Sequence, residues 1–413
     1  MEETAVKEPA ENSLKKSSMK DLLQIRNYRY LLFGQAIAML GDGVYTLALV
    51  WSMKELTGSS VHMAYVLAAG VIPTIILGIF AGVIVDRGNQ KNIMLAADIF
   101  RSLALFGLFT LFVLDLLAPW MLIVSAFIVS SFSAFFTPAR AVAIRSIVPD
   151  ELMIRAQSAS STVQVVTGLA APVIAGILLA IGLRFAFLFN AIMFLLSFVF
   201  IRLINQPELL AKKPEKLNRS VFMTDLKEGF HTIIRAPILR AMIIYLVLIN
   251  FMFAPVELLL PAYVNNPSQL AIIEVAFFIG ILTGSIAINF FADRPKIYPI
   301  VIGLLMILLP FAGLGVITNF IISCLFIGLA GAGSTLVNIT LSTLFMVKIP
   351  REVIGRSQST MRVLLEGVNP ASLLLAGILM TFISVQQMFL AIAAFGIIIV
   401  LLMVANPLVR KAA

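Results

Sequence analysis

The chain has 413 residues, of which 60% are hydrophobic and only 12% are charged. Soluble globular domains are about half apolar and about a quarter charged, so this composition excludes that class. The formal net charge of +9 does not require a nucleic-acid partner, because the basic residues are spread along the connections between apolar runs. Those runs are roughly 20 residues long, the length of a helix that crosses a bilayer.

The apolar runs predict an all-α membrane protein with about twelve transmembrane helices, since lipid offers no partner for unpaired backbone groups. A β-barrel is excluded because its strands alternate in polarity, whereas the run at 300–317 does not. In chain order the expected spans are 30–54, 62–85, 93–115, 119–141, 157–181, 184–204, 238–263, 270–292, 297–317, 319–346, 359–383 and 386–405.

These spans predict two six-helix bundles separated by one long polar stretch. Within that stretch Phe222, Leu226 and Phe230 recur at helical spacing, which is typical of an amphipathic helix lying on a membrane surface. The expected segments are an N-terminal tail at 1–29, a bundle at 30–204, a linker with the amphipathic helix at 205–237, a bundle at 238–405 and a C-terminal tail at 406–413.

The distribution of basic residues predicts the orientation of the chain. Lys and Arg mark the cytoplasmic loops of membrane proteins. With the N-terminus inside, only Lys54 and Arg184 of the 30 Lys and Arg residues fall on the outer side. The sequence therefore predicts cytoplasmic N- and C-termini. Residues 1–20 lack the apolar core of a signal peptide, so we expect them to belong to the cytoplasmic tail.

The two halves share an internal repeat. Pro149-Asp-Glu-Leu-Met-Ile-Arg-Ala-Gln-Ser158 follows the fourth expected span, and Pro350-Arg-Glu-Val-Ile-Gly-Arg-Ser-Gln-Ser359 follows the tenth. Pro, Glu, Arg, Gln and Ser recur in register. Duplicated six-helix units are typical of secondary transporters, in which the substrate site lies between the repeats.

Four carboxyl groups within or near the expected spans call for an explanation, since a charge at mid-membrane is expensive. Asp42 lies about halfway along the first span, Glu366 about two turns into the eleventh and Glu257 in the outer half of the seventh. We predict that these three line a proton-coupling or substrate cavity; the alternative is neutral packing carboxyls. Glu274 is expected to be a solvated cap at the outer end of the eighth span.

Several motifs resemble the major facilitator superfamily, and more narrowly its macrolide-efflux-type branch of proton-coupled exporters. They are Gly82-Val-Ile-Val-Asp86-Arg87-Gly-Asn-Gln-Lys91, Arg26-Asn-Tyr-Arg-Tyr-Leu-Leu-Phe-Gly-Gln35 followed by Gly41-Asp42, Thr137-Pro-Ala-Arg140 and Asp225-Leu-Lys-Glu-Gly-Phe230. The resemblance implies two bundles that rock about a central cavity, in the cytoplasmic membrane of a bacterium.

The resemblance also implies a conformational gate at Gly82, Asp86, Arg87 and Lys91. Asp86 at the cytoplasmic end of its span can accept hydrogen bonds from a helix N-terminus in the opposite bundle, where partial positive charge favours it. The natural partner is the start of the eleventh span, near 357–359.

A supporting charge network is expected at Asp98, Arg101 and Arg140. Asp98 and Arg101 are one helical turn apart, so they can pair with each other or with Arg140. Such a network serves either the packing of the bundle or its switching.

No cofactor and no metal are expected. The two histidines, His62 and His231, fall in different regions and Cys324 is alone, which argues against a metal site. The chain has no glycine-lysine phosphate loop, so ATP is not expected to drive it directly. These features argue against an enzyme.

The predicted function is a secondary active transporter that exports amphipathic, drug-like or macrolide-like small molecules in exchange for protons, as a monomer. The first alternative is a proton- or sodium-coupled uptake carrier, or an exporter of siderophores or metabolites, with the same fold. An alternative of another class is a non-transporting membrane sensor or a lipid scramblase.

Overall fold

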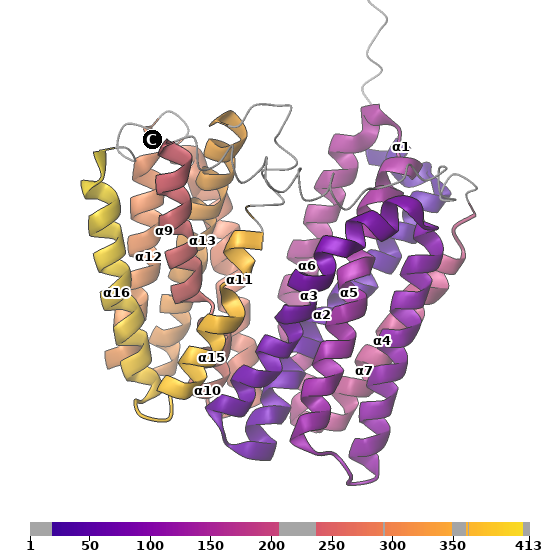
Figure 1. The fold of residues 1–413 in the computed structure, drawn as a ribbon, viewed down its shortest axis with the longest axis horizontal. Coiled ribbons are helices and arrows are strands. Elements are labelled where there is room, and N and C mark those ends of the chain that lie inside the picture. The colour runs from indigo at the N-terminus through magenta and orange to yellow at the C-terminus, as the bar shows by residue number, and fades with distance from the viewer. Residues whose placement is uncertain (1–18, 206–236, 292–293, 349–360, 362, 408–413) are drawn as a thin grey trace, which may run out of the picture.

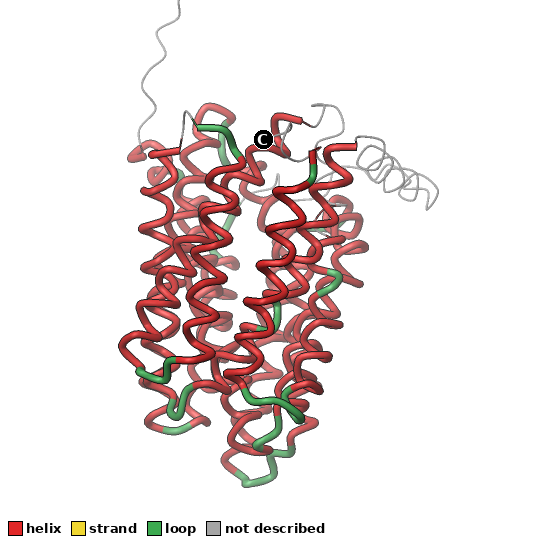
Figure 2. The backbone as a smooth tube through the Cα atoms, turned by 90° about the vertical axis from the view of Figure 1, so that its left-hand side faces the viewer, coloured by secondary structure: helices red, strands yellow, loops and turns green. Residues whose placement is uncertain are grey.

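The computed structural model describes residues 19–205, 237–291, 294–348, 361 and 363–407. The amphipathic helix expected in the linker lies outside these ranges, as do most of the N-terminal tail and the end of the C-terminal tail. Within the described ranges the chain folds into helices joined by short connections, as the red and green tube of Figure 2 shows. The all-α prediction is confirmed.

The first half of the chain forms one bundle, indigo to magenta in Figure 1. Its elements are α1 (Met19–Gln24), α2 (Arg26–Thr57), α3 (Ser60–Arg87), α4 (Gln90–Val113), α5 (Pro119–Ile147), the 3-10 turn η1 (Asp150–Leu152), α6 (Met153–Ile181) and α7 (Leu183–Arg202).

The second half forms a second bundle, red through orange to yellow in Figure 1. Its elements are α9 (Pro237–Phe253), α10 (Val256–Tyr263), α11 (Pro267–Ala287), the 3-10 turn η3 (Ile288–Phe291), α12 (Ile297–Val316), α13 (Phe320–Lys348), α15 (Asn369–Leu379) and α16 (Val385–Ala405). We call the two units the N-bundle and the C-bundle.

The predicted number of spans is confirmed. Among the described residues, eleven helices are long and apolar enough to cross a membrane, and the apolar helix Val363–Leu379 is shorter. This shorter helix occupies the place of the eleventh expected span. The chain is therefore a multi-pass membrane protein.

Local sequence signals explain where the helices start and stop. Asn89 and Asn266 begin α4 and α11, where their side-chain oxygens accept hydrogen bonds from Asn92 N at 3.0 Å and Gln269 N at 2.9 Å. Such caps satisfy backbone donors that have no partner inside the helix. Gly58 ends α2 in the left-handed conformation, with φ of 59°, which costs a glycine little.

Two spans of the C-bundle are broken by proline. Pro255 separates α9 from α10, and the helix that begins at Val363 is interrupted at Gly367 before α15 resumes with Pro370 in its first turn. Proline has no N–H, so Phe251 O loses its donor four residues on. Ser372 Oγ of α15 donates to that carbonyl instead, which joins the two broken spans.

The two bundles meet at the end of the molecule away from the chain termini. We call the end where α2 begins and α16 finishes the basic face, and the other end the opposite face. Lys54 Nζ donates to Pro261 O at 2.7 Å and to Val264 O at 2.6 Å, and Ser60 Oγ donates to Gly377 O at 3.0 Å. In Figure 1 the bundles lie close at this end and diverge toward the basic face.

Glycines bring helices of the C-bundle into backbone contact. A Cβ on Gly331 of α13 would collide with Phe277 O of α11, and a Cβ on Gly280 of α11 would collide with Gly328 O. Small residues permit this close packing in membranes, where apolar area alone gives little driving force. We call these two contacts, of Gly331 with Phe277 and of Gly280 with Gly328, the glycine seam of the C-bundle.

Candidate functional site

A buried arginine anchors a charge network inside the N-bundle. Arg101 of α4 is 0% exposed and forms an ion pair with Asp98, one turn earlier on the same helix. Arg101 Nη1 also donates to Ser133 Oγ of α5 at 3.2 Å. Its guanidinium lies over the rings of Phe136 and Phe194, 4.6 Å and 4.2 Å from their centroids. The ion pair and the ring contacts stabilise a charge that is otherwise costly to bury.

Asp98 is satisfied from a second helix. It is 0% exposed, and Ser197 Oγ of α7 donates to Asp98 Oδ2 at 2.7 Å. The pair formed by Asp98 and Arg101 therefore ties α4, α5 and α7 together.

Asp42 lies at the edge of this network. Its Oδ2 is 3.7 Å from Arg101 Nη1, and its side chain is 44% accessible although that of Arg101 is 1% accessible. Asp42 also interacts electrostatically with Arg140 of α5. The three predicted network residues thus lie together with Asp42, which sits between the buried pair and Arg140.

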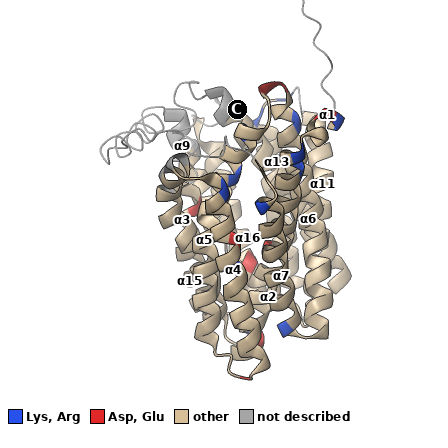
Figure 3. Cartoon of the chain, turned by 90° about the vertical axis from the view of Figure 1, so that its right-hand side faces the viewer, with Lys and Arg blue, Asp and Glu red and all other residues tan. Residues whose placement is uncertain are grey.

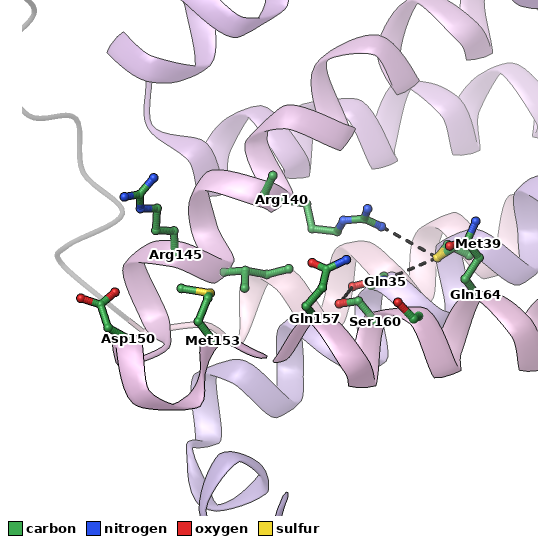
Figure 4. A pocket seen from close by; sticks show the side chains of 12 residues that line it. Gln35, Met39, Arg140, Arg145, Asp150, Met153, Gln157, Ser160 and Gln164 are labelled. Carbon is green, nitrogen blue, oxygen red and sulfur yellow. Dashed lines mark hydrogen bonds between the residues drawn. The ribbon is translucent and has the colours of Figure 1, made fainter. Parts of the chain in front are cut away.

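Arg140 lines a polar cavity of about 470 Å³ within the N-bundle. Figure 4 shows Arg140 beside Met39, with the glutamine and serine side chains of α2 and α6 facing it. Arg140 Nη1 contacts the sulfur of Met39 at 3.8 Å, and Arg140 Nε is buried without a hydrogen-bond partner. The polar lining consists of Gln35, Gln157, Ser160, Ser161 and Gln164, with Arg145 and Asp150 also in the wall.

A second cavity, of about 450 Å³, lies within the C-bundle and is mainly apolar. Its walls include four phenylalanines, at Phe253, Phe277, Phe278 and Phe311. Two carboxyl groups also line this cavity, Glu257 of α10 and Glu274 of α11.

The expectation that Glu274 is a solvated cap is wrong. Glu274 lies in the wall of the apolar cavity with Glu257, about two turns inside α11. The cause of the error is the position of the helix start. Asn266 caps α11 and Pro267 opens it, so the span begins earlier than its apolar run suggests.

Glu366 lies apart from that cavity in the described geometry. It ends the helical segment that precedes the break at Gly367, and it is not among the residues that line either cavity. It therefore marks the broken eleventh span. Its predicted transport role stays a prediction.

The structure describes only part of the predicted gate. A Cβ on Gly82 would meet nothing within 4 Å, so the backbone there is open. The side chains of Asp86 and Arg87, and the expected partner at 357–359, lie outside the described residues. Lys91 Nζ donates to Arg202 O at 2.8 Å and to Ile204 O at 2.5 Å, and thereby caps the end of α7 within its own bundle.

Sequence reasoning missed most of the polar cavity. Gln157, Ser160 and Gln164 lie on one face of α6 at spacings of three, four and seven residues. That period inside an apolar span is a signal of a polar helix face. Lys54 was also missed as the link between bundles, although a lysine near the end of a span can reach backbone carbonyls beyond it.

Charge is distributed unevenly along the molecule. Figure 3 shows Lys and Arg mainly toward the end that holds the C-terminus, with acidic residues also at mid-height among the helices. The carboxyl groups at mid-height belong to the interior of the bundles, where both cavities lie.

Comparison with known proteins agrees with the family resemblance of the sequence motifs. The family model described as Major Facilitator Superfamily matches residues 31–368. Macrolide efflux protein A of Streptococcus pyogenes is 25% identical over 393 residues, which cover 92% of this chain and 94% of the relative. The multidrug efflux pump Tap of Mycolicibacterium fortuitum is 24% identical over 400 residues, covering 92% and 96%.

Solved structures share the fold at low identity. The nucleoside transporter NupG matches with a TM-score of 0.74 and 12% identity, over 92% of this chain and 98% of that one. A bacterial homologue of the iron transporter ferroportin, in an inward-facing state, matches with a TM-score of 0.69 and 15% identity, over 92% and 98%.

Proposed function

Because this chain belongs to the major facilitator superfamily, we propose that it is a secondary active transporter that exports amphipathic small molecules in exchange for protons. The family membership and the efflux proteins among its relatives make it a transporter. The direction of transport, the proton and the substrate class belong to the proposal.

The position of Asp42 carries the proposal. Asp42 touches the fully buried Arg101 yet keeps 44% of its side chain accessible. A carboxyl group in that position can take up a proton from water, and protonation removes its attraction to Arg101. Protonation of Asp42 thereby weakens a contact between α2 and α4, so that proton binding can change how these two helices pack.

The packing of the bundles supports alternating access. Lys54 and Ser60 close the opposite face with hydrogen bonds to backbone carbonyls of the C-bundle. The polar cavity with Arg140 lies toward the basic face, because its wall includes Asp150 in the connection from α5 to α6. If the basic face is cytoplasmic, as the positive-inside rule predicts, this is the state that takes up cargo from the cytoplasm.

Export is favoured by the relatives, whose names include macrolide efflux and multidrug efflux. The same comparison supports amphipathic drug-like cargo. An uptake carrier with this fold is the outcome that the experiment distinguishes.

Transport into everted membrane vesicles tests the proposal. The probes are erythromycin, ethidium and ciprofloxacin, and the pH gradient is collapsed with nigericin. We expect at least one probe to accumulate in a nigericin-sensitive way, and Asp42→Asn to abolish that accumulation. Asp115→Asn is the matched control, because Asp115 lies in an exposed turn at φ of 57°, a conformation that asparagine accepts.

Two results would contradict the proposal. The first is that no probe accumulates in response to the gradient. The second is that accumulation continues unchanged in Asp42→Asn, since the proton would then be carried elsewhere. Accumulation only in right-side-out vesicles would show uptake and reverse the assigned direction.

A further inference from the structure

The two cavities have opposite chemistry. The polar cavity of the N-bundle offers the guanidinium of Arg140 and the amide and hydroxyl groups of α2 and α6, while Arg145 and Asp150, both exposed, have opposite charges. The apolar cavity of the C-bundle offers two carboxyl groups among phenylalanines, and no Lys or Arg is among its lining residues. One cavity is suited to an anionic group and the other to a cation.

No ion pair is formed by Arg140, Glu257 or Glu274 among the residues that the structure describes, although Asp42 interacts electrostatically with Arg140. Arg140 Nε is buried without an acceptor, and the described contact of the guanidinium is a sulfur atom, which is a weak acceptor. Glu257 and Glu274 have no hydrogen-bond or ion-pair partner within the part of the chain that the structure describes. A buried donor without an acceptor destabilises the protein, and a ligand that pairs with it removes that cost.

The two cavities lie on either side of the contact between α6 and α11. The ring of Phe278, which lines the apolar cavity, lies where a Cβ on Gly168 would be. Gln164, one turn before Gly168, lines the polar cavity, and Glu274, one turn before Phe278, lines the apolar one. Since the two helices are antiparallel, Gln164 and Glu274 differ in height by about eight residues, or about 12 Å.

We infer that the transported molecule is amphoteric: a protonated amine lies between Glu257 and Glu274, an aromatic or aliphatic middle lies against Phe277 and Phe278, and a carboxylate pairs with Arg140. The inference rests on the proposed transport function and names its substrate class. Guanidinium binds a carboxylate through two parallel hydrogen bonds. The phenylalanine faces add an attraction for the cation.

A matched trio of ligands tests the inference. Ciprofloxacin carries an amine and a carboxylate at opposite ends of an aromatic core; its methyl ester keeps only the amine charge, and its N-acetyl derivative keeps only the carboxylate. Binding is measured by fluorescence on the full chain in nanodiscs without a pH gradient. We expect ciprofloxacin to bind at least tenfold more tightly than either derivative.

Substitutions then assign each end of the ligand. Arg140→Gln should lower the affinity for ciprofloxacin to that of the ester and leave ester binding unchanged. Glu257→Gln and Glu274→Gln should lower it toward that of the N-acetyl derivative and leave binding of that derivative unchanged. Arg184→Gln and Glu151→Gln, on exposed residues that line neither cavity, are controls that should stay within about twofold. Retained binding of the ester by Arg140→Gln, and of the N-acetyl derivative by the two glutamate variants, shows that each variant is folded.

Equal affinity for ciprofloxacin and its methyl ester would overturn the inference, as would the absence of ciprofloxacin binding. So would loss of ester binding in Arg140→Gln. These outcomes are distinct from failure of the proposed function, which concerns gradient-driven movement in vesicles. If the predicted binding pattern is found without gradient-driven movement, the inference about the substrate stands and proton coupling is rejected. If gradient-driven movement is found without the binding pattern, proton coupling stands and the inference about the substrate is rejected.

Discussion

The N-bundle and the C-bundle treat buried polar groups in different ways. In the N-bundle the helices run unbroken through the span region, and Arg101 pairs with Asp98 and approaches Asp42. In the C-bundle two spans are broken at Pro255 and Gly367, and Glu257 and Glu274 have no hydrogen-bond or ion-pair partner among the described residues. Discontinuous helices are typical of substrate sites in transporters. We propose on this basis that proton coupling belongs to the N-bundle and most of cargo binding to the C-bundle.

The two bundles also differ in the contacts that hold their helices together. The N-bundle is tied across α4, α5 and α7 by one charged group and its partners. The C-bundle is tied across α11 and α13 by backbone contact at the glycine seam. One bundle therefore depends on charge and the other on the absence of side chains, and different substitutions should break them.

The largest effect is expected from Arg101→Met. It leaves Asp98 buried without a counter-ion and removes the hydrogen bond to Ser133, which should cost about 3–5 kcal/mol of stability. Thermal unfolding in detergent measures the loss. The double substitution Asp98→Leu and Arg101→Met should recover most of it, because no lone charge remains. A double variant as unstable as the single one would contradict the account.

Gly331→Leu should break the glycine seam. A side chain there collides with Phe277 O of α11, and overpacking costs about 1–3 kcal/mol. Gly107→Leu is the matched control, because a Cβ on Gly107 meets nothing within 4 Å. The prediction fails if both variants unfold at the same temperature in the same detergent.

Lys54→Met should loosen the contact between bundles without harming either one. Lys54 makes two hydrogen bonds to carbonyls of the C-bundle, and bonds to charged groups contribute about 1.5–3 kcal/mol. We expect the population open at the opposite face to rise about tenfold. Electron-electron distance measurements between labels at Leu116→Cys and Phe382→Cys, in a Cys324→Ser background, detect this change.

Arg184→Met is the control for that measurement, since Arg184 is exposed and lies over the ring of Phe185 inside the N-bundle. It should leave the distance between the two labels unchanged. The same distance distribution in Lys54→Met and in the unsubstituted chain would show that Lys54 does not hold the opposite face closed.

The smallest effect is expected from Asn190→Leu in the N-bundle. Asn190 is 0% exposed, and neither atom of its amide has a hydrogen-bond partner. Replacing an unsatisfied amide with a side chain of similar size should stabilise the protein by about 1–2 kcal/mol. A lower unfolding temperature for this variant would show that the amide has a partner, such as a bound water.

The sequence alone predicts the fold well and the site only in part. Span length and apolar composition locate most spanning helices to within a few residues, because the bilayer imposes both. The exceptions are α5, which continues to Ile147 beyond the expected end at 141, and α1, which was not expected. Asp42, Glu257 and the pair of Asp98 and Arg101 stand out as charges in apolar runs. The breaks at Pro255 and Gly367 are less visible, since proline inside a membrane helix is often accommodated without a break.

The cavities could not be predicted, because they depend on which faces of separate helices meet. Glu274 looked like a cap since its distance from the start of α11 was underestimated, and only the fold places it beside Glu257. Arg140 and Gln164 lie on different helices, 24 positions apart, and share a wall only in three dimensions. Partners across helices are set by packing rather than by local sequence.

Proton movement in proteoliposomes that contain the dye pyranine tests most directly whether Asp42 couples protons to cargo. Ciprofloxacin is added on one side, and the internal pH is followed over time. The account predicts a rapid pH change for the unsubstituted chain and for Asp115→Asn, and none for Asp42→Asn, although Asp42→Asn still binds ciprofloxacin. A pH change of normal rate in Asp42→Asn would contradict the account.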